Sequence, residues 1–332
     1  MKKIMNNPDH VVKEMVEGFI AAFGTDYEKL TNVNGIVFKE RKDKVGVLIG
    51  GGSGHEPLFL GFVGLGLADG AAIGNVFAAP TPNTIVETTK AIDSGKGVLY
   101  VYGNYAGDTL NFDMGAEIAE NEGIQTTTVL VRDDVASAPL DRIHDRRGIA
   151  GDVFVIKVAG AAADADLSLK EVARIAQKAS DNTRSIGVAL SPGSIPGSEK
   201  YTFTIENDEI EFGMGIHGEP GIRRTKIMNA DELTDYLLNY LLEDLPFKQG
   251  DEVCVLVNGL GSTTLMELMI VNRRVAEVLR KKGITVYDTD INSYCTTQEM
   301  GGVSITLFRL DEELKGYYDQ PAYSPFYMKK GR

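Results

Sequence analysis

The chain is poor in cysteine, in positive charge and in long apolar runs, and each shortage excludes a class of protein. Its only cysteines, Cys254 and Cys295, form no CxxC pair, so neither a disulfide framework nor a zinc site is indicated. Lys and Arg number 34 against 47 Asp and Glu, a net charge of −13 that disfavours nucleic acid or a membrane surface as partner. Glycines interrupt the longest apolar stretch, 58–68, which is too short to span a bilayer.

The composition is typical of a folded globular protein. Apolar residues make up 43% and charged residues 24% of 332 positions, which suits two domains of roughly 150 residues each. Lys2 and Lys3 are followed by a polar stretch that does not match a signal peptide. We expect a cytoplasmic protein.

Short apolar runs alternate with amphipathic stretches, which predicts an α/β fold with parallel strand pairing. A change of pattern near residue 182 divides the chain into a first α/β domain, 1–182, with a mainly parallel sheet flanked by helices, and a second, 183–332, with a mixed sheet. Residues 202–205 and 209–212 are predicted to pair as an antiparallel hairpin. The other strands are predicted at 45–49, 98–102, 126–131, 186–190, 253–257, 285–287 and 303–310, and the helices at 8–24, 82–95, 111–122, 168–179, 230–242 and 263–282.

A glycine-dense loop, 50–57, follows the first predicted buried strand. Ligands of open α/β sheets bind beyond the carboxyl ends of strands, and the backbone around Gly52, Ser53 and Gly54 lets a small polar ligand approach closely. The loop lacks the Gly-Lys-Ser/Thr ending of a phosphate-binding loop, and His55 stands where a nucleophile elbow needs glycine. The alternative is a tight turn that only packs strand against helix.

Two further loops follow strands. Residues 103–108 end in Asp108, whose alternative role is to cap the helix expected from Asn111. Residues 258–263 precede another helix, with Ser262 a plausible cap, and this loop could equally pack at a domain junction.

A fourth glycine-rich segment, 213–221, matches GxGxxG by spacing but not by context. Glu219-Pro220-Gly221 breaks any helix where a dinucleotide fingerprint needs one, so that interpretation is rejected. Of the four histidines, His55 and His217 lie in such glycine-dense turns, whereas the other two fall at solvated positions. Neutral imidazoles together with Asp108 suit reversible carbonyl or hydroxyl chemistry.

Six ordered motifs resemble the dihydroxyacetone kinase substrate-binding subunit, from the first helix to Leu310. They lie at 50–57, 103–108 with 110–112, 146–150, 211–221, 257–261 and 294–297. The resemblance implies that His217 holds dihydroxyacetone as a covalent hemiaminal, with Asp108 or His55 as the base, His55 orienting the carbonyl oxygen, and Gly52, Ser53 and Gly54 in contact with the substrate.

The resemblance also implies partners. The chain itself would bind no cofactor or metal; the nucleotide, with magnesium, would lie on a partner subunit L that a phosphohistidine subunit M recharges from phosphoenolpyruvate. The family is usually homodimeric. Gly103 and Ala106 depart from the Lys and Thr that many members carry in that loop, which leaves two alternatives open: another small ketose as substrate, or a paralogue acting as a transcriptional co-activator. A lipid carrier on a related two-domain fold is a weaker alternative.

Overall fold

The computed structural model describes residues 2–40 and 42–332 and divides the chain into two compact units. The first comprises Met1–Val131, Asp152–Ala179 and Leu314–Arg332, and the second comprises Arg132–Gly151 and Ser180–Glu313. These contact units differ from the ranges 1–182 and 183–332 in the segments 132–151, 180–182 and 314–332. Whether those two ranges fold as domains stays a prediction.

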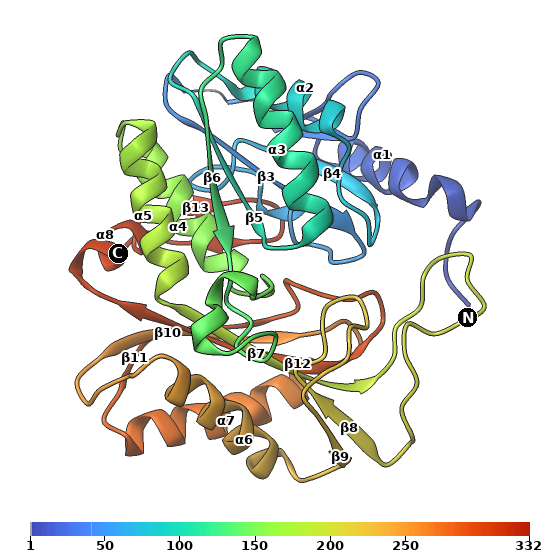
Figure 1. Ribbon diagram of the computed structural model, residues 1–332, viewed down its shortest axis with the longest axis vertical. Helices are drawn as coiled ribbons and strands as arrows, with labels where there is room; N and C mark the ends of the chain where they lie inside the picture. Colours follow the sequence, from blue (N-terminus) through green and yellow to red (C-terminus); the bar gives the residue numbers. More distant parts are fainter. Residues whose placement is uncertain (1, 41) are drawn as a thin grey trace. The chain divides into compact units, whose positions relative to one another are not determined.

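The first unit is built on a six-stranded sheet in the order β1-β2-β4-β3-β5-β6 (Figure 1). Its strands are β1 (Tyr27–Lys29), β2 (Gly35–Phe38), β3 (Gly46–Ser53), β4 (Gly70–Val76), β5 (Val98–Gly103) and β6 (Thr126–Val131). The pairs β3–β4, β3–β5 and β5–β6 are parallel and the β1–β2 and β2–β4 pairs antiparallel, so the mainly parallel sheet is confirmed. A short pair, β13 (Ala322–Tyr323) and β14 (Met328–Lys329), lies apart from it.

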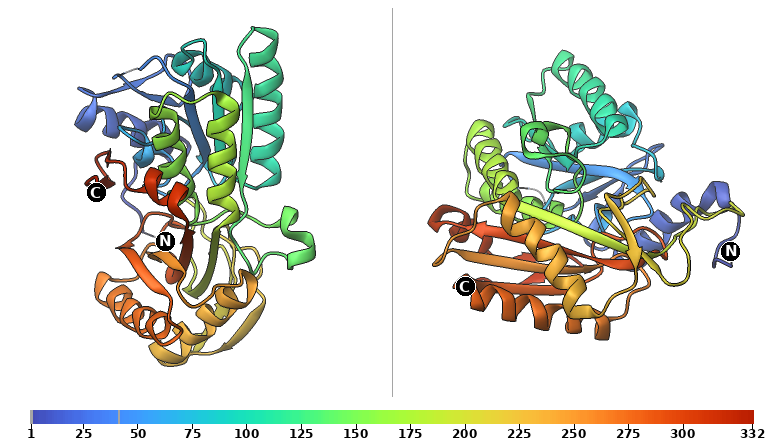
Figure 2. Two further views of the ribbon diagram at one scale, coloured as in Figure 1. Left: turned by 90° about the vertical axis from the view of Figure 1, so that its left-hand side faces the viewer. Right: turned by 60° about the horizontal axis from the view of Figure 1, so that its bottom comes forward.

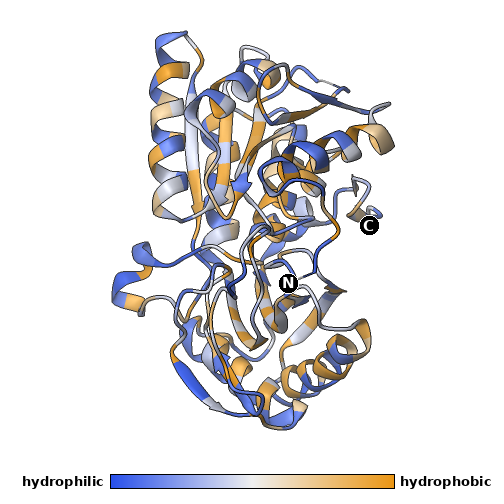
Figure 3. Ribbon diagram, turned by 90° about the vertical axis from the view of Figure 1, so that its right-hand side faces the viewer, coloured by the Kyte–Doolittle hydropathy of each residue, from blue (hydrophilic) through white to orange (hydrophobic). Residues whose placement is uncertain are grey.

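Helices flank this sheet, as the alternating pattern predicts. They are α1 (Val11–Phe23), α2 (Pro82–Ile92), α3 (Ala106–Asn121), α4 (Asp152–Asp164) and α5 (Leu169–Asp181), together with most of α8 (Glu312–Tyr318). Helix α3 runs along the strands (Figure 2, left) and closes with α2 over a core that includes Leu48, Tyr100 and Phe112. Helix α4 contacts β3 and β5 and is buried on every side from Asp152 to Ala163, which explains why no amphipathic pattern marks it. The strands of this sheet are largely apolar (Figure 3).

The second unit has a mixed six-stranded sheet, again as predicted. Its strands are β7 (Thr183–Ser191), β8 (Glu209–Phe212), β9 (Arg223–Lys226), β10 (Glu252–Gly259), β11 (Thr285–Asn292) and β12 (Gly301–Leu310), in the order β11-β10-β12-β7-β8-β9. Only the β10–β11 pair is parallel. Helices α6 (Ala230–Asp244) and α7 (Leu265–Lys281) lie together on one face (Figure 1).

Three local predictions are wrong, and each correction bears on the candidate site. Residues 202–205 form no strand; instead β8 pairs with β9, so the segment 213–222 is the connection of that hairpin. Helix α3 begins at Ala106, five residues early, which places Asp108 inside its first turn. The cap of α7 is Thr264, which forms a capping box with Glu267, and not Ser262.

Short 3-10 turns complete the described residues, at Pro8–His10, Leu60–Phe62 and Leu140–Asp145. The first is capped by Asn7, whose side chain accepts the Asp9 N–H at 3.0 Å, and it leads directly into α1, which ends at Gly24 as expected. Among the described helices, none is both long and apolar enough to cross a membrane.

Candidate active site

His217 lies in the β8–β9 connection of the second unit, where a carboxylate fixes its ring. Its Nδ1 is 2.9 Å from Oε1 of Glu219, whose other oxygen accepts the backbone N–H of His217. Burial alone would raise the pKa of Glu219, but the hydrogen bond from His217 and the charges of His217 and Arg147 outweigh it and lower the pKa to about 2. An ionised carboxylate only accepts hydrogen bonds, so Nδ1 carries a proton, and whenever the ring is neutral its lone pair is on Nε2.

Arg147 lies beside the Glu219 carboxylate. Its Nη1 lies 3.8 Å from Oε2 of Glu219, and its Nη2 donates to the Gly213 carbonyl at 3.1 Å. Asp134 in turn accepts from Nε and Nη2 of Arg147 at 3.1 and 2.9 Å; burial raises the pKa of Asp134 to about 6 although Arg147 opposes the shift. The chain of charges Asp134–Arg147–Glu219 therefore ends at the His217 ring.

The β8–β9 connection is closely packed on both sides of Ile216. A Cβ on Gly215 would lie 2.0 Å from Oε2 of Glu219 and 2.3 Å from Nη1 of Arg147, so a side chain here would displace the Glu219 carboxylate or the Arg147 guanidinium. The buried Thr297 hydroxyl donates to the Ile216 carbonyl at 2.6 Å, immediately before His217. The 294–297 motif thus positions the histidine loop.

The 257–261 motif has a structural role in the same unit. The buried Asn258 side chain accepts the N–H groups of Tyr294 and Cys295 at 2.8 and 2.9 Å and donates to the Cys295 carbonyl and the Ser304 hydroxyl. Asn258 therefore holds the segment that contains Thr297. This supports the interpretation that the loop 258–263 has a packing role.

His55 and Asp108 belong to the first unit, at one edge of its sheet. His55 follows β3 and Asp108 follows β5, and these two strands are parallel neighbours, so both loops emerge at their carboxyl ends. His55 is 2% exposed, and its ring stacks on Phe77 with centroids 5.1 Å apart. Asp108 is half-buried in the first turn of α3.

The glycine loop of β3 is held against the loop that follows β4. The Ser53 hydroxyl, buried, donates to the Gly74 carbonyl at 2.7 Å, and a Cβ on Gly52 would lie 2.8 Å from the Ala78 nitrogen. Gly54 has φ +105° and its N–H reaches both carboxylate oxygens of Glu56 at 3.0 Å. Glycine is needed here for close packing as well as for ligand approach, so both interpretations of the loop apply.

The other two histidines and the thiols lie outside the two loops. His10 and His144 are exposed, as expected, and Cys254 and Cys295 are buried and not joined in a disulfide. Across residues 2–40 and 42–332, no group of three His, Cys, Asp or Glu side chains is placed to hold a metal ion.

The structure adds three residues that sequence reasoning did not assign: Glu219, Arg147 and Thr297. All lie inside motifs quoted for the resemblance. The available signal was that His55 and His217 are each followed within two residues by a glutamate and then a proline, which places a carboxylate close to each ring.

Comparison with known proteins confirms the resemblance. The Dak1 domain model matches residues 17–326. The dihydroxyacetone-binding subunit DhaK of PTS-dependent dihydroxyacetone kinase 2 from Listeria innocua is 46% identical over 330 residues, covering 98% of this chain and 99% of that subunit.

Two solved structures are similar over nearly the whole chain. The dihydroxyacetone kinase of C. freundii, in complex with AMP-PNP and Mg2+, superposes with a TM-score of 0.92 at 31% identity, over 99% of this chain and 61% of that one. The dihydroxyacetone kinase operon co-activator DhaQ superposes with a TM-score of 0.90 at 31% identity, over 96% and 98%. The chain therefore belongs to the Dak1 domain family, among the relatives of the DhaK subunits of dihydroxyacetone kinases.

Proposed function

We propose that this chain is the dihydroxyacetone-binding subunit of a phosphoenolpyruvate-dependent dihydroxyacetone kinase. It holds the ketone as a hemiaminal on His217 while a nucleotide-carrying subunit L transfers phosphate to a substrate hydroxyl. The observation that carries the proposal is the bond between His217 Nδ1 and the ionised Glu219, in a chain of this family.

Addition at His217 needs a lone pair and a counter-charge, and Glu219 supplies the conditions for both. Nε2 adds to the carbonyl carbon, the carbonyl π pair moves to oxygen, and that oxygen takes a proton, so the adduct keeps every atom of the ketone. The ring becomes cationic as the bond forms, and the Glu219 carboxylate balances that charge through Nδ1–H. Glycerol has no carbonyl for Nε2 to attack, so bond formation itself discriminates ketone from polyol.

His55 and Asp108 take the acid–base roles. His55, fixed by its stack on Phe77, orients the carbonyl oxygen or exchanges a proton with it. Asp108 accepts the proton of the hydroxyl that attacks phosphorus. The substrate contacts the backbone of Gly52 and Gly54 and the side-chain oxygen of Ser53. The Ser53 hydroxyl proton is donated to the Gly74 carbonyl.

An exposed apolar stripe on α3 supports a partner that docks beside Asp108. Leu110, Met114 and Ile118, at successive turns of the helix that begins next to Asp108, are 62%, 47% and 40% exposed. Apolar surface left on a folded chain is typical of an interaction site. A subunit L seated there brings its phosphate donor to the same end of the sheet, and subunit M acts through L. A homodimer of this chain stays a prediction.

The alternative is a co-activator that binds the ketone without transferring phosphate. The similarity to the co-activator structure favours it, together with Gly103 and Ala106, which remove a charge and a hydroxyl from the loop before Asp108. The retention of His55, Asp108 and His217 favours the kinase subunit, because loss of the acid–base pair is the simplest route to a pure sensor.

Reconstituted transfer separates the two functions. The chain is mixed with subunit L, nucleotide, magnesium, the phosphohistidine subunit M and phosphoenolpyruvate, and dihydroxyacetone, glyceraldehyde and erythrulose are supplied in parallel. We expect pyruvate release that depends on this chain and is fastest with dihydroxyacetone. Substrate binding without pyruvate release supports the co-activator, and faster release with erythrulose than with dihydroxyacetone corrects the substrate.

A further inference from the structure

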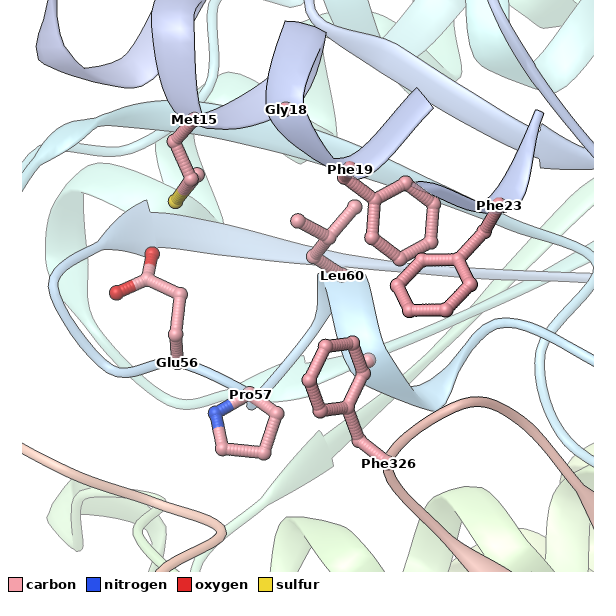
Figure 4. Close-up of a pocket in the computed structure, with 9 residues that line it drawn as sticks. Met15, Gly18, Phe19, Phe23, Glu56, Pro57, Leu60 and Phe326 are labelled. Carbon is pink, nitrogen blue, oxygen red and sulfur yellow. The ribbon is translucent and has the colours of Figure 1, made fainter. Parts of the chain in front are cut away.

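The first unit contains a cavity of about 450 Å³ between α1 and the segment around Phe326 (Figure 4). Its wall is mainly apolar and includes Phe19, Phe23, Leu60 and Phe326. The three phenylalanine rings pack on one another, with centroid separations of 5.2, 5.8 and 6.4 Å. A volume of this size and an aromatic lining are typical of sites for small organic molecules.

One carboxylate, that of Glu56, lines the same cavity. Figure 4 shows Glu56 and Met15 on one side of Leu60, Phe19 and Phe23 on the other, and Phe326 below it. Burial raises the pKa of Glu56, although the Gly54 N–H bonds to both of its oxygens oppose the shift. The backbone N–H of Glu56 itself also bonds to this carboxylate. A carboxylate has about four acceptor sites, so an ammonium group in the cavity can share them with these N–H groups and would offset the cost of burying the charge.

A glycine in the middle of α1 keeps the cavity open. Gly18 lines it, and a Cβ built there meets no atom within 4 Å. Gly160 in α4 is different, because a Cβ there would lie 2.4 Å from the Leu67 carbonyl oxygen. Glycine inside a helix costs about 0.5–1 kcal/mol relative to alanine, and at position 18 no packing contact requires it. The effect of Gly18 is to leave space over the aromatic wall.

We propose that this cavity binds a small organic ammonium ion that carries an aromatic ring or a short aliphatic chain. The ammonium group bonds to the Glu56 carboxylate, and the apolar body lies against Phe19, Phe23 and Phe326. Aromatic faces attract cations as well as apolar groups, and the Met15 thioether is polarisable, so the lining suits both ends of such a ligand.

Occupancy of the cavity acts on the loop that carries His55. The carboxylate that receives the ammonium also holds the N–H of Gly54, next to His55 in the chain. Under the proposed function, the bound cation therefore changes the affinity for dihydroxyacetone. That consequence rests on the proposed function, whereas binding of the cation does not.

Titration calorimetry with 2-phenylethylammonium tests the site, with its neutral isostere 2-phenylethanol in parallel. We expect saturable binding of the cation and at least tenfold weaker binding of the alcohol. Gly18→Leu fills the cavity with a good helix former, so it should raise thermal stability and weaken binding of the cation at least tenfold. Gly316→Leu is the matched control, because Gly316 is also helical with open space at its Cβ, and it should bind like the wild type.

Three results overturn the proposal: no saturable binding of the cation, equal binding of cation and alcohol, or undiminished binding in Gly18→Leu. If Gly18→Leu instead shifts the chain to a smaller oligomer in light scattering while the wild type ignores the cation, the cavity holds a second copy and the proposal also fails. Glu56→Gln should weaken binding of the cation and not of the alcohol; if that variant does not fold, the wild-type comparison of the two ligands decides. Dihydroxyacetone adduct formation, measured on the same wild-type sample, reports separately on the proposed function.

Discussion

The two histidine loops are held in opposite ways. The His217 side chain is 26% exposed and is fixed by charge, through Glu219 and behind it Arg147. The His55 residue is 2% exposed and is fixed by packing, through its stack on Phe77 and the closely packed glycines before it. A buried hydroxyl holds each loop: Thr297 donates to the Ile216 carbonyl of the His217 loop, and Ser53 of the His55 loop donates to the Gly74 carbonyl.

This difference matches the two kinds of chemistry proposed. A nucleophile that forms and breaks a bond to an incoming ketone needs access and a nearby counter-charge, as His217 has. A ring that only orients an oxygen or passes a proton needs a fixed position and little exposure, as His55 has. The two loops should therefore fail in different ways when altered.

The largest expected effect is a loss of phosphate transfer that exceeds the loss of ketone binding when His55 or Asp108 is altered. Asp108→Asn and His55→Asn should lower phosphate transfer by on the order of 10²–10⁴-fold, as loss of general acid–base catalysis does, while the hemiaminal still forms in part. Coupled pyruvate release measures transfer and native mass spectrometry measures the adduct. Asp113→Asn, an exposed change on the same helix, is the control. Unchanged transfer in both variants would remove the acid–base assignment.

Thr297→Val tests the hydroxyl that holds the His217 loop. It leaves the Ile216 carbonyl without this donor, which should lower the free energy of unfolding by about 1–3 kcal/mol. Adduct formation should slow as well, since Ile216, whose carbonyl loses its donor, directly precedes His217. Urea unfolding measures the first effect, with the exposed Thr285→Val as control. A stability loss with wild-type adduct kinetics would make Thr297 structural only.

Glu219→Gln separates charge from shape at His217. The amide still accepts from Nδ1 but does not balance the cationic ring, so hemiaminal formation should slow on the order of tenfold. Stopped-flow mixing with dihydroxyacetone measures the rate, and the exposed Glu206→Gln serves as control. Equal rates in Glu219→Gln and the wild type contradict a role for the counter-charge.

Acid should weaken the His217 loop through Glu219, and the sign follows from its pKa. Folding lowers that pKa from 4.5 to about 2, so the stabilisation is complete above about pH 4.5 and is lost as the pH falls toward 2. Urea midpoints of the wild type and Glu219→Gln should therefore converge across that interval. A gap between them that is constant from pH 5 to pH 2.5 contradicts the assignment.

The sequence predicted the sheets better than it predicted the loops. Strand–helix alternation and the apolar runs at 45–49 and 98–102 were sufficient for β3 and β5, because buried parallel strands have a continuous apolar pattern. The pairing of β8 was misjudged, because 202–205 alternates like a strand whereas β9, Arg223–Lys226, is charged and exposed and has no strand pattern. The predicted start of α3 was five residues too late, because Gly107, in the first turn, is not typical of a helix.

His55, Asp108 and His217 were chosen as site residues from the family resemblance. The residues that contact them were found only in the structure. The contacts of Arg147 and Thr297 with the His217 loop span 66 and 81 residues of sequence, and no local pattern contains such pairings. Glu219, two residues from His217, was within reach of sequence reasoning. Its role became clear only with the Nδ1 to Oε1 distance.

The central claim is that Nε2 of His217 bonds covalently to the ketone. Native mass spectrometry of the wild type and of His217→Ala, each mixed with dihydroxyacetone and separately with glycerol, tests it most directly. We predict a gain of the full mass of the ketone, with no loss of water, in the wild type with dihydroxyacetone alone. A wild type that gains no mass, or a His217→Ala chain that gains the same mass, contradicts the account.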